Sequence, residues 1–79
     1  MKLTISRRAN DRWAVDGAMR FNARSELGDH VTVDVSQAAW REITAYWAGD
    51  PIGKLEELAS DRRAHWGNFG ADLVWRVYL

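Results

Sequence analysis

The sequence predicts a single α+β domain in which an antiparallel β-meander is followed by two helices and a strand that returns to the sheet (ββββ-αα-β). Apolar residues alternate with polar ones in four stretches before residue 36, helical spacing replaces alternation after it, and alternation resumes at residue 72. Residues 1–79 are expected to share one core, because domains usually contain about 50–250 residues. Helices on one face of an antiparallel sheet are a standard arrangement for such a pattern.

Turn-forming residues separate the four alternating stretches of the first half. Asn10 and Asp11 tolerate turn conformations, Gly17 interrupts the second alternation, and Gly28 lies in a third turn. Because alternation is the period of a half-buried strand, each stretch is expected to turn one face to the core. The expected strands cover residues 2–6, 12–16, 19–24 and 30–35.

The first helix is expected over residues 37–48. Ser36 precedes it as a suitable N-cap, and Gly49 follows it as a stop signal. Spacings of three and four residues place an apolar stripe on its inner side. This stripe comprises Trp40, Ile43 and Trp47, widened by Ala39 and Tyr46.

A second helix and a final strand complete the predicted domain. Asp50 as N-cap and Pro51 at the first helical position open the helix, and Gly67 is its expected end. Its inner stripe is Ile52, Leu55, Leu58 and Ala59. Alternation over residues 72–79 predicts the strand, whose partner in the sheet the sequence leaves open.

Charge and composition narrow the classes of function. Eleven basic residues balance eleven acidic ones, so no overall field steers the chain to nucleic acid or to an anionic membrane. No apolar run is long enough to span a bilayer. With no cysteine, disulfides and thiolate zinc sites are excluded, and a cytoplasmic location is expected. One or two of the five tryptophans are expected to be partly exposed, because so small a core is unsuited to cover them all.

No catalytic residues are expected, and neither a cofactor nor a metal is predicted. The serines lack a surrounding motif, and Ser36 is explained as a helix cap. Asp61 and His65 share a helical face but supply only two possible metal ligands. Gly67 and Gly70 precede a strand, whereas phosphate-binding glycines follow a strand and open a helix. The chain is therefore predicted not to be an enzyme.

Two surfaces are candidates for binding. The first is the outer side of the second helix, where acidic residues beside an aromatic anchor could engage a basic protein groove: Glu56, Glu57, Asp61 and Trp66. The second is the exposed sheet face, where guanidinium groups and a ring could stack and pair with nucleic acid. Its expected residues are Arg20, Arg24, Arg76 and Tyr78.

Two resemblances bear on function. The stretch from Val33 to Trp40 (VDVSQAAW), followed by Asp50-Pro51 and Leu55, resembles a small bacterial domain family of unknown function over residues 17–63. In size and organisation the chain also resembles the small anti-CRISPR proteins of phages and mobile elements. That resemblance implies an inhibitor without cofactors that occludes a protein surface.

Three functional hypotheses follow from the sequence. The leading one is a protein-binding inhibitor or adaptor of the anti-CRISPR type, with a protein partner such as a CRISPR effector complex. The second is a nucleic-acid-binding module that uses the sheet face. The third is a structural homodimer, so the chain is expected to be either a monomer or a homodimer.

Overall fold

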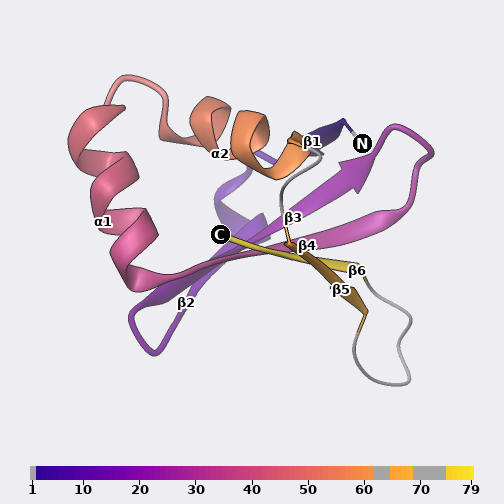
Figure 1. The fold of residues 1–79 in the computed structure, drawn as a ribbon, viewed down its shortest axis with the longest axis horizontal. Helices are drawn as coiled ribbons and strands as arrows, with labels where there is room; N and C mark the ends of the chain where they lie inside the picture. The colour runs from indigo at the N-terminus through magenta and orange to yellow at the C-terminus, as the bar shows by residue number, and fades with distance from the viewer. Residues whose placement is uncertain (1, 62–64, 69–74) are drawn as a thin grey trace.

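The computed structural model describes residues 2–61, 65–68 and 75–79. Within them, six strands form one mixed sheet, and two helices cover one of its faces (Figure 1). This confirms the α+β class predicted from the sequence. The strands are β1 (Leu3–Ile5), β2 (Arg12–Val15), β3 (Ala18–Ser25), β4 (His30–Val35), β5 (His65–Asn68) and β6 (Trp75–Tyr78). The helices are α1 (Gln37–Tyr46) and α2 (Pro51–Ser60), and a 3-10 turn, η1, covers Ala9–Asp11.

Strands β1 and β2 lie one after the other along the same edge of β3. Strand β1 pairs with residues 23–25 of β3 and β2 with residues 18–21, while the other edge of β3 pairs with β4. The four expected N-terminal strands therefore occupy three positions across the sheet rather than four. The turn η1 separates β1 from β2, so both can pair with the same edge of β3.

Residues with positive φ angles lie in the turns of both hairpins. Asp16 and Gly17 have φ of 50° and 84° and form the two-residue connection between β2 and β3. This pair of positive angles suits the right-handed twist of a tight hairpin. Between β3 and β4, Gly28 has φ of 88°, and the Ser25 hydroxyl accepts hydrogen bonds from the amides of Leu27 and Asp29.

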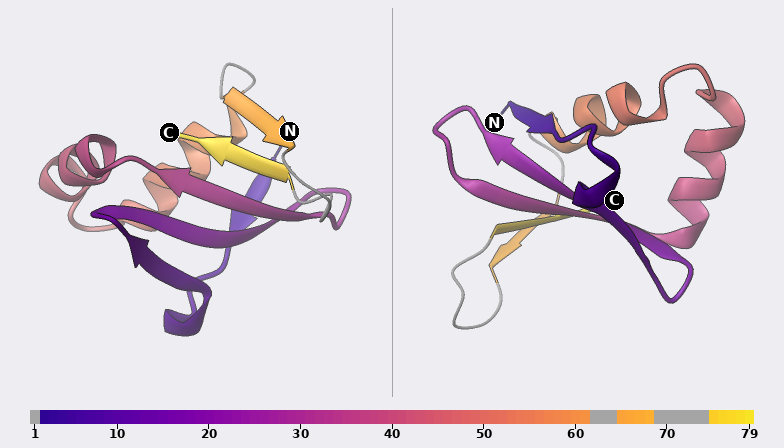
Figure 2. Two further views of the ribbon diagram at one scale, coloured as in Figure 1. Left: turned by 90° about the horizontal axis from the view of Figure 1, so that it is seen from below. Right: turned by 180° about the vertical axis from the view of Figure 1, so that it is seen from behind.

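The C-terminal part differs most from the prediction. Helix α2 ends at Ser60 instead of Gly67, and residues 65–68 form β5. The final strand, β6, returns to the sheet as expected, but it lies parallel to β4 and between β4 and β5 (Figure 2). A fully antiparallel sheet was expected. The expected strand start at 72–74 lies outside the described residues.

The core lies between the helices and one face of the sheet. Alternate strand residues point to this face because successive side chains of a strand point to opposite sides. Both predicted N-caps are confirmed: the Ser36 hydroxyl accepts from the Ala39 amide, and the Asp50 carboxylate accepts from the Gly53 amide. The buried apolar side chains are Leu3, Ile5, Phe21, Ala23, Val31, Val33, Val35, Ile43, Ile52, Leu55, Ala59 and Val77.

Candidate functional site: two surfaces on opposite sides of the sheet

Helix α2 runs beside the free edge of β1 and binds it through two side chains. Glu56 Oε1 accepts a hydrogen bond from the Ile5 amide at 3.0 Å, and Ser60 Oγ accepts one from the Leu3 amide at 2.9 Å. Four residues of helix rise about 6 Å and two residues of strand about 6.8 Å, so the acceptors match the spacing of the donors. We call this pair of contacts the edge clamp. It satisfies amides that an edge strand would otherwise leave open to another chain.

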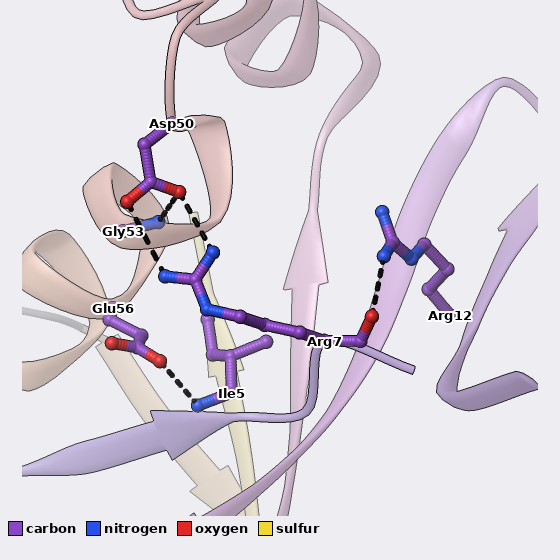
Figure 3. A network of polar contacts seen from close by, with 6 residues as sticks. All are labelled: Ile5, Arg7, Arg12, Asp50, Gly53 and Glu56. Carbon is purple, nitrogen blue, oxygen red and sulfur yellow. Dashed lines mark hydrogen bonds and ion pairs between the residues drawn. The ribbon is translucent and has the colours of Figure 1, made fainter. Parts of the chain in front are cut away.

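An ion pair fixes the other end of α2 to the segment after β1. Arg7 donates to both oxygens of the Asp50 carboxylate, at 2.9 and 3.4 Å (Figure 3). Asp50 also caps α2 through Gly53, where an added Cβ would overlap the Asp50 carboxylate. The hydrogen bonds from Arg7 and from the Gly53 amide lower the pKa of Asp50, and the same carboxylate raises the pKa of Arg7.

The lowered pKa of Asp50 predicts an acid-sensitive contribution to stability. The unfolded chain takes up this proton near the ordinary aspartate pKa of about 3.9, before the folded chain does. The contribution is therefore complete above that pH and is lost as the pH falls through the lower pKa of the folded state. Asp50→Asn retains an oxygen for the cap but loses the titration, so its melting temperature should fall less steeply below about pH 4. Arg7→Gln should flatten the same curve; a slope unchanged in both variants would refute this role.

The four residues predicted as an acidic protein-binding surface are not equivalent. Glu56 lies against β1 in the edge clamp. Glu57 is exposed and accepts a hydrogen bond from Lys54 Nζ at 3.4 Å. Asp61 follows the end of α2, where its amide donates to the Leu58 carbonyl. Trp66 belongs to β5 and pairs in register with Val77, and its side chain lies outside the described part of the structure.

The end of α1 presents an aromatic pair that the sequence placed on the inner stripe. Tyr46 and Trp47 are 75% and 42% exposed, and their rings meet edge to face with centroids 6.1 Å apart. The ammonium of Lys54 lies 4.5 Å from the centre of the Trp47 ring. Helix α1 ends at Tyr46, and the Trp47 amide closes it on the Ile43 carbonyl. The chain leaves the helix at Trp47, and the side chain of this residue is partly exposed to solvent.

A hollow of about 260 Å³ lies between α1 and α2 beside Trp47. Its lining includes three apolar side chains, those of Ala39, Ile43 and Leu58, and the exposed Glu42. Trp47 and Lys54 complete the lining. We call this hollow, with the adjoining Tyr46, the aromatic groove. Among the tryptophans whose side chains the structure describes, Trp47 here and Trp13 on the sheet are exposed, at 42% and 39%, and Trp40 is half-buried.

The outer sheet face carries the residues of the alternative prediction in separate rows. Register places Trp13, Arg20, Asp34 and Tyr78 in one row across four strands. Arg20 Nε is 2.9 Å from Asp34 Oδ1, so Arg20 is paired within the chain. Arg24 lies four residues farther along β3, about 13 Å away at the strand rise. Arg76 pairs in register with Thr32 between these rows, and its side chain lies outside the described residues.

Across the part of the chain that the structure describes, no three histidine, aspartate or glutamate residues gather as a possible metal site. Nor is either helix in that part long and apolar enough to cross a membrane.

Comparison of the chain with protein-family models, with curated proteins and with solved structures found no match. The two resemblances drawn from the sequence therefore remain predictions.

Proposed function

We propose that this chain is a non-enzymatic protein-binding module and that it holds its partner in the aromatic groove. The observation that carries the proposal is the exposed edge-to-face pair of Tyr46 and Trp47 beside an apolar hollow. Tryptophan and tyrosine are enriched among the few residues that carry most of the free energy of protein association. A hollow beside them offers the pocket that a partner side chain needs.

Contacts within the chain position Trp47 in the groove without a partner. Trp47 is held by Tyr46 on one side and by Lys54 on another, and Lys54 is itself held by Glu57. Fixing a side chain on binding costs about 0.5–1.5 kcal/mol, and a side chain already fixed avoids much of this cost. Preorganisation therefore favours binding through Trp47.

The charge around the groove indicates the chemistry of the partner. Glu42 is an exposed residue of its lining, and the one cation of that lining, Lys54, is engaged by the exposed Glu57 and by the Trp47 ring. We infer a partner segment that inserts an apolar side chain between the helices and places lysine or arginine next to it. This retains the acidic character predicted for the binding surface, with Trp47 in place of Trp66 as its aromatic anchor.

The proposal that the chain is not an enzyme is supported by the hydrogen bonds that the serine hydroxyls make within the fold. Ser25, Ser36 and Ser60 accept hydrogen bonds from backbone amides. Ser6 donates to Asp11 at 2.6 Å. The hydroxyls of Ser25, Ser36 and Ser60 thus hold a turn, a helix cap and an edge strand, and the Asp11 carboxylate that Ser6 contacts is itself engaged by Asn22.

More specifically, we propose that the chain is an inhibitor of the anti-CRISPR type, which acts in the cytoplasm by steric occlusion. A domain with one ordered groove suits occlusion because blocking a surface requires binding alone. The proposed target is a protein surface on a host defence complex such as a CRISPR effector complex.

Affinity capture from bacterial lysates tests this function, with one lysate that contains a CRISPR effector complex. The tagged chain should retain a stoichiometric protein partner after nuclease treatment, and Glu42→Lys with Glu57→Lys should release it. Arg24→Glu, a charge reversal on the opposite sheet face, serves as the matched control and should retain the partner. Recovery of nucleic acid alone, or of a second copy of this chain alone, would contradict the proposal in favour of the other two hypotheses.

A further inference from the structure

A second hollow lies on the sheet face away from the helices, at the end distant from Arg20. Its volume is about 540 Å³, within the range of about 300–1,000 Å³ typical of small-molecule sites. Strand β1, the segment that follows it, β3 and β4 all contribute to its walls. We call it the basic hollow; its lining residues are Thr4, Ser6, Arg8, Asp11, Asn22, Ala23, Arg24 and His30.

Strand register brings the polar groups of this hollow together. The Cα of Arg24 pairs with that of Thr4 on one side and with that of His30 on the other. Paired residues share a face of a sheet, and neighbouring strands are about 4.8 Å apart, so these three residues stand abreast. Both Arg24 and His30 are exposed, as is Arg8 from the segment after β1. Residues far apart in sequence thus converge on one concavity.

Asp11 organises this hollow, since both its carboxylate oxygens are engaged within the chain. Ser6 Oγ donates to Oδ2 at 2.6 Å, and Asn22 Nδ2 donates to Oδ1 at 3.2 Å. These hydrogen bonds, followed by the charges of Arg8 and His30, lower the pKa of Asp11. The carboxylate therefore fixes the hydroxyl and the amide in place.

The lining is left with a surplus of positive charge. Two guanidinium groups face one carboxylate, whereas the whole chain has a formal net charge of zero. Arg24 Nη1 donates to the Gly28 carbonyl at 3.3 Å, which orients the guanidinium and leaves its other N–H groups for a ligand. A planar guanidinium suits the oxygens of a phosphate, to which it can donate two parallel hydrogen bonds.

We propose that the basic hollow binds a phosphate group. Arg24 donates to the phosphate through its guanidinium, with Arg8 and His30 as further donors and the Thr4 hydroxyl beside them. Two sources share this chemistry, a free nucleotide and the backbone of a nucleic-acid strand. The site lies across the sheet from the aromatic groove and is independent of the proposed protein-binding function.

Titration with inorganic phosphate, followed by amide chemical shifts, tests the site directly. Saturable shifts confined to the amides of residues 4–11, 22–24 and 28–30 are expected, with sodium chloride at equal ionic strength as the reference. Arg24→Gln should weaken phosphate binding by about tenfold or more, because hydrogen bonds to charged groups contribute strongly. Arg41→Gln, at an exposed arginine of α1, is the matched control and should leave the affinity unchanged.

Two further titrations identify the source of the phosphate. If a mononucleotide binds as tightly as oligothymidylate, the ligand is a free nucleotide. If the oligonucleotide binds more tightly and with a steeper salt dependence, the ligand is a nucleic-acid strand, because each phosphate contacted adds to that slope. Linear, non-saturating shifts with phosphate in the unmodified protein would overturn the proposal. So would oligonucleotide shifts that centre on Arg20 and leave the hollow unchanged.

Discussion

Trp47→Ala is expected to weaken binding of the protein partner by about 2–4 kcal/mol, or roughly 30- to 1000-fold. The substitution removes the largest ring of the aromatic groove, together with its contacts to Tyr46 and Lys54. It also removes a wall of the hollow that receives the partner side chain. Calorimetric titration of the captured partner into each variant measures the loss.

Trp13→Ala is the matched control for this prediction. Trp13 is 39% exposed and Trp47 is 42% exposed, so the two substitutions remove tryptophans of similar exposure. Trp13 lies in register with Arg20, on the sheet face away from the helices, and its loss should leave the affinity within a factor of about three. Tyr46→Ala, at a side chain that is 75% exposed, adds a variant with little effect on the fold. An equal loss for Trp13→Ala and Trp47→Ala would place the contact elsewhere.

Glu56→Ala is expected to lower the free energy of unfolding by about 1–3 kcal/mol, the cost of leaving a partly buried donor without its partner. The donor is the Ile5 amide at the edge of β1, whose hydrogen bond Glu56 Oε1 accepts. Because so small a domain has a margin of only about 3–5 kcal/mol, this loss is a large part of its stability. Urea unfolding followed by tryptophan fluorescence measures it.

Glu57→Ala tests whether the stability lost in Glu56→Ala comes from the edge clamp or from the removal of a negative charge. Glu57 is the neighbouring residue of α2 but is exposed, with a single hydrogen bond from Lys54. Its loss should change stability by no more than about 0.5 kcal/mol. Glu56→Gln retains an oxygen acceptor and should recover part of the stability lost in Glu56→Ala. Hydrogen exchange at the Ile5 amide should accelerate in Glu56→Ala alone; equal behaviour of the two alanine variants would refute the edge clamp.

Local sequence rules predicted the elements whose causes are local. Ser36 and Asp50 cap their helices as expected, because a cap depends on residues two or three positions away. Alternation found the first four strands for the same reason, although β2 buries none of its residues in the core. By contrast, the shared edge of β3 and the parallel pairing of β6 with β4 depend on contacts between distant segments. Residues 65–68 are too few to show a strand period, so the first part of β5 was taken for the end of a helix that stops at Gly67.

In the candidate sites, too, local patterns predicted some features, whereas others depend on contacts between distant segments. The outward position of Glu57 follows from helical period, but Glu56 meets Ile5 across 51 residues of sequence, which no local pattern reveals. Trp47 was assigned to the inner stripe because α1 was expected to continue to residue 48. The helix instead ends at Tyr46, and Trp47 is its C-cap. The basic hollow arises only when Arg8, Arg24 and His30 meet across strands.

Hydrogen exchange of the partner complex, compared with the free chain, tests the location of the protein-binding surface most directly. Binding in the aromatic groove should slow exchange at residues 44–50, where α1 ends and the groove opens, and at the first turns of α2. Amides of residues 18–24 and 30–34 should exchange at the same rate in both states. Protection of the sheet residues with residues 44–50 unchanged would contradict binding through the aromatic groove.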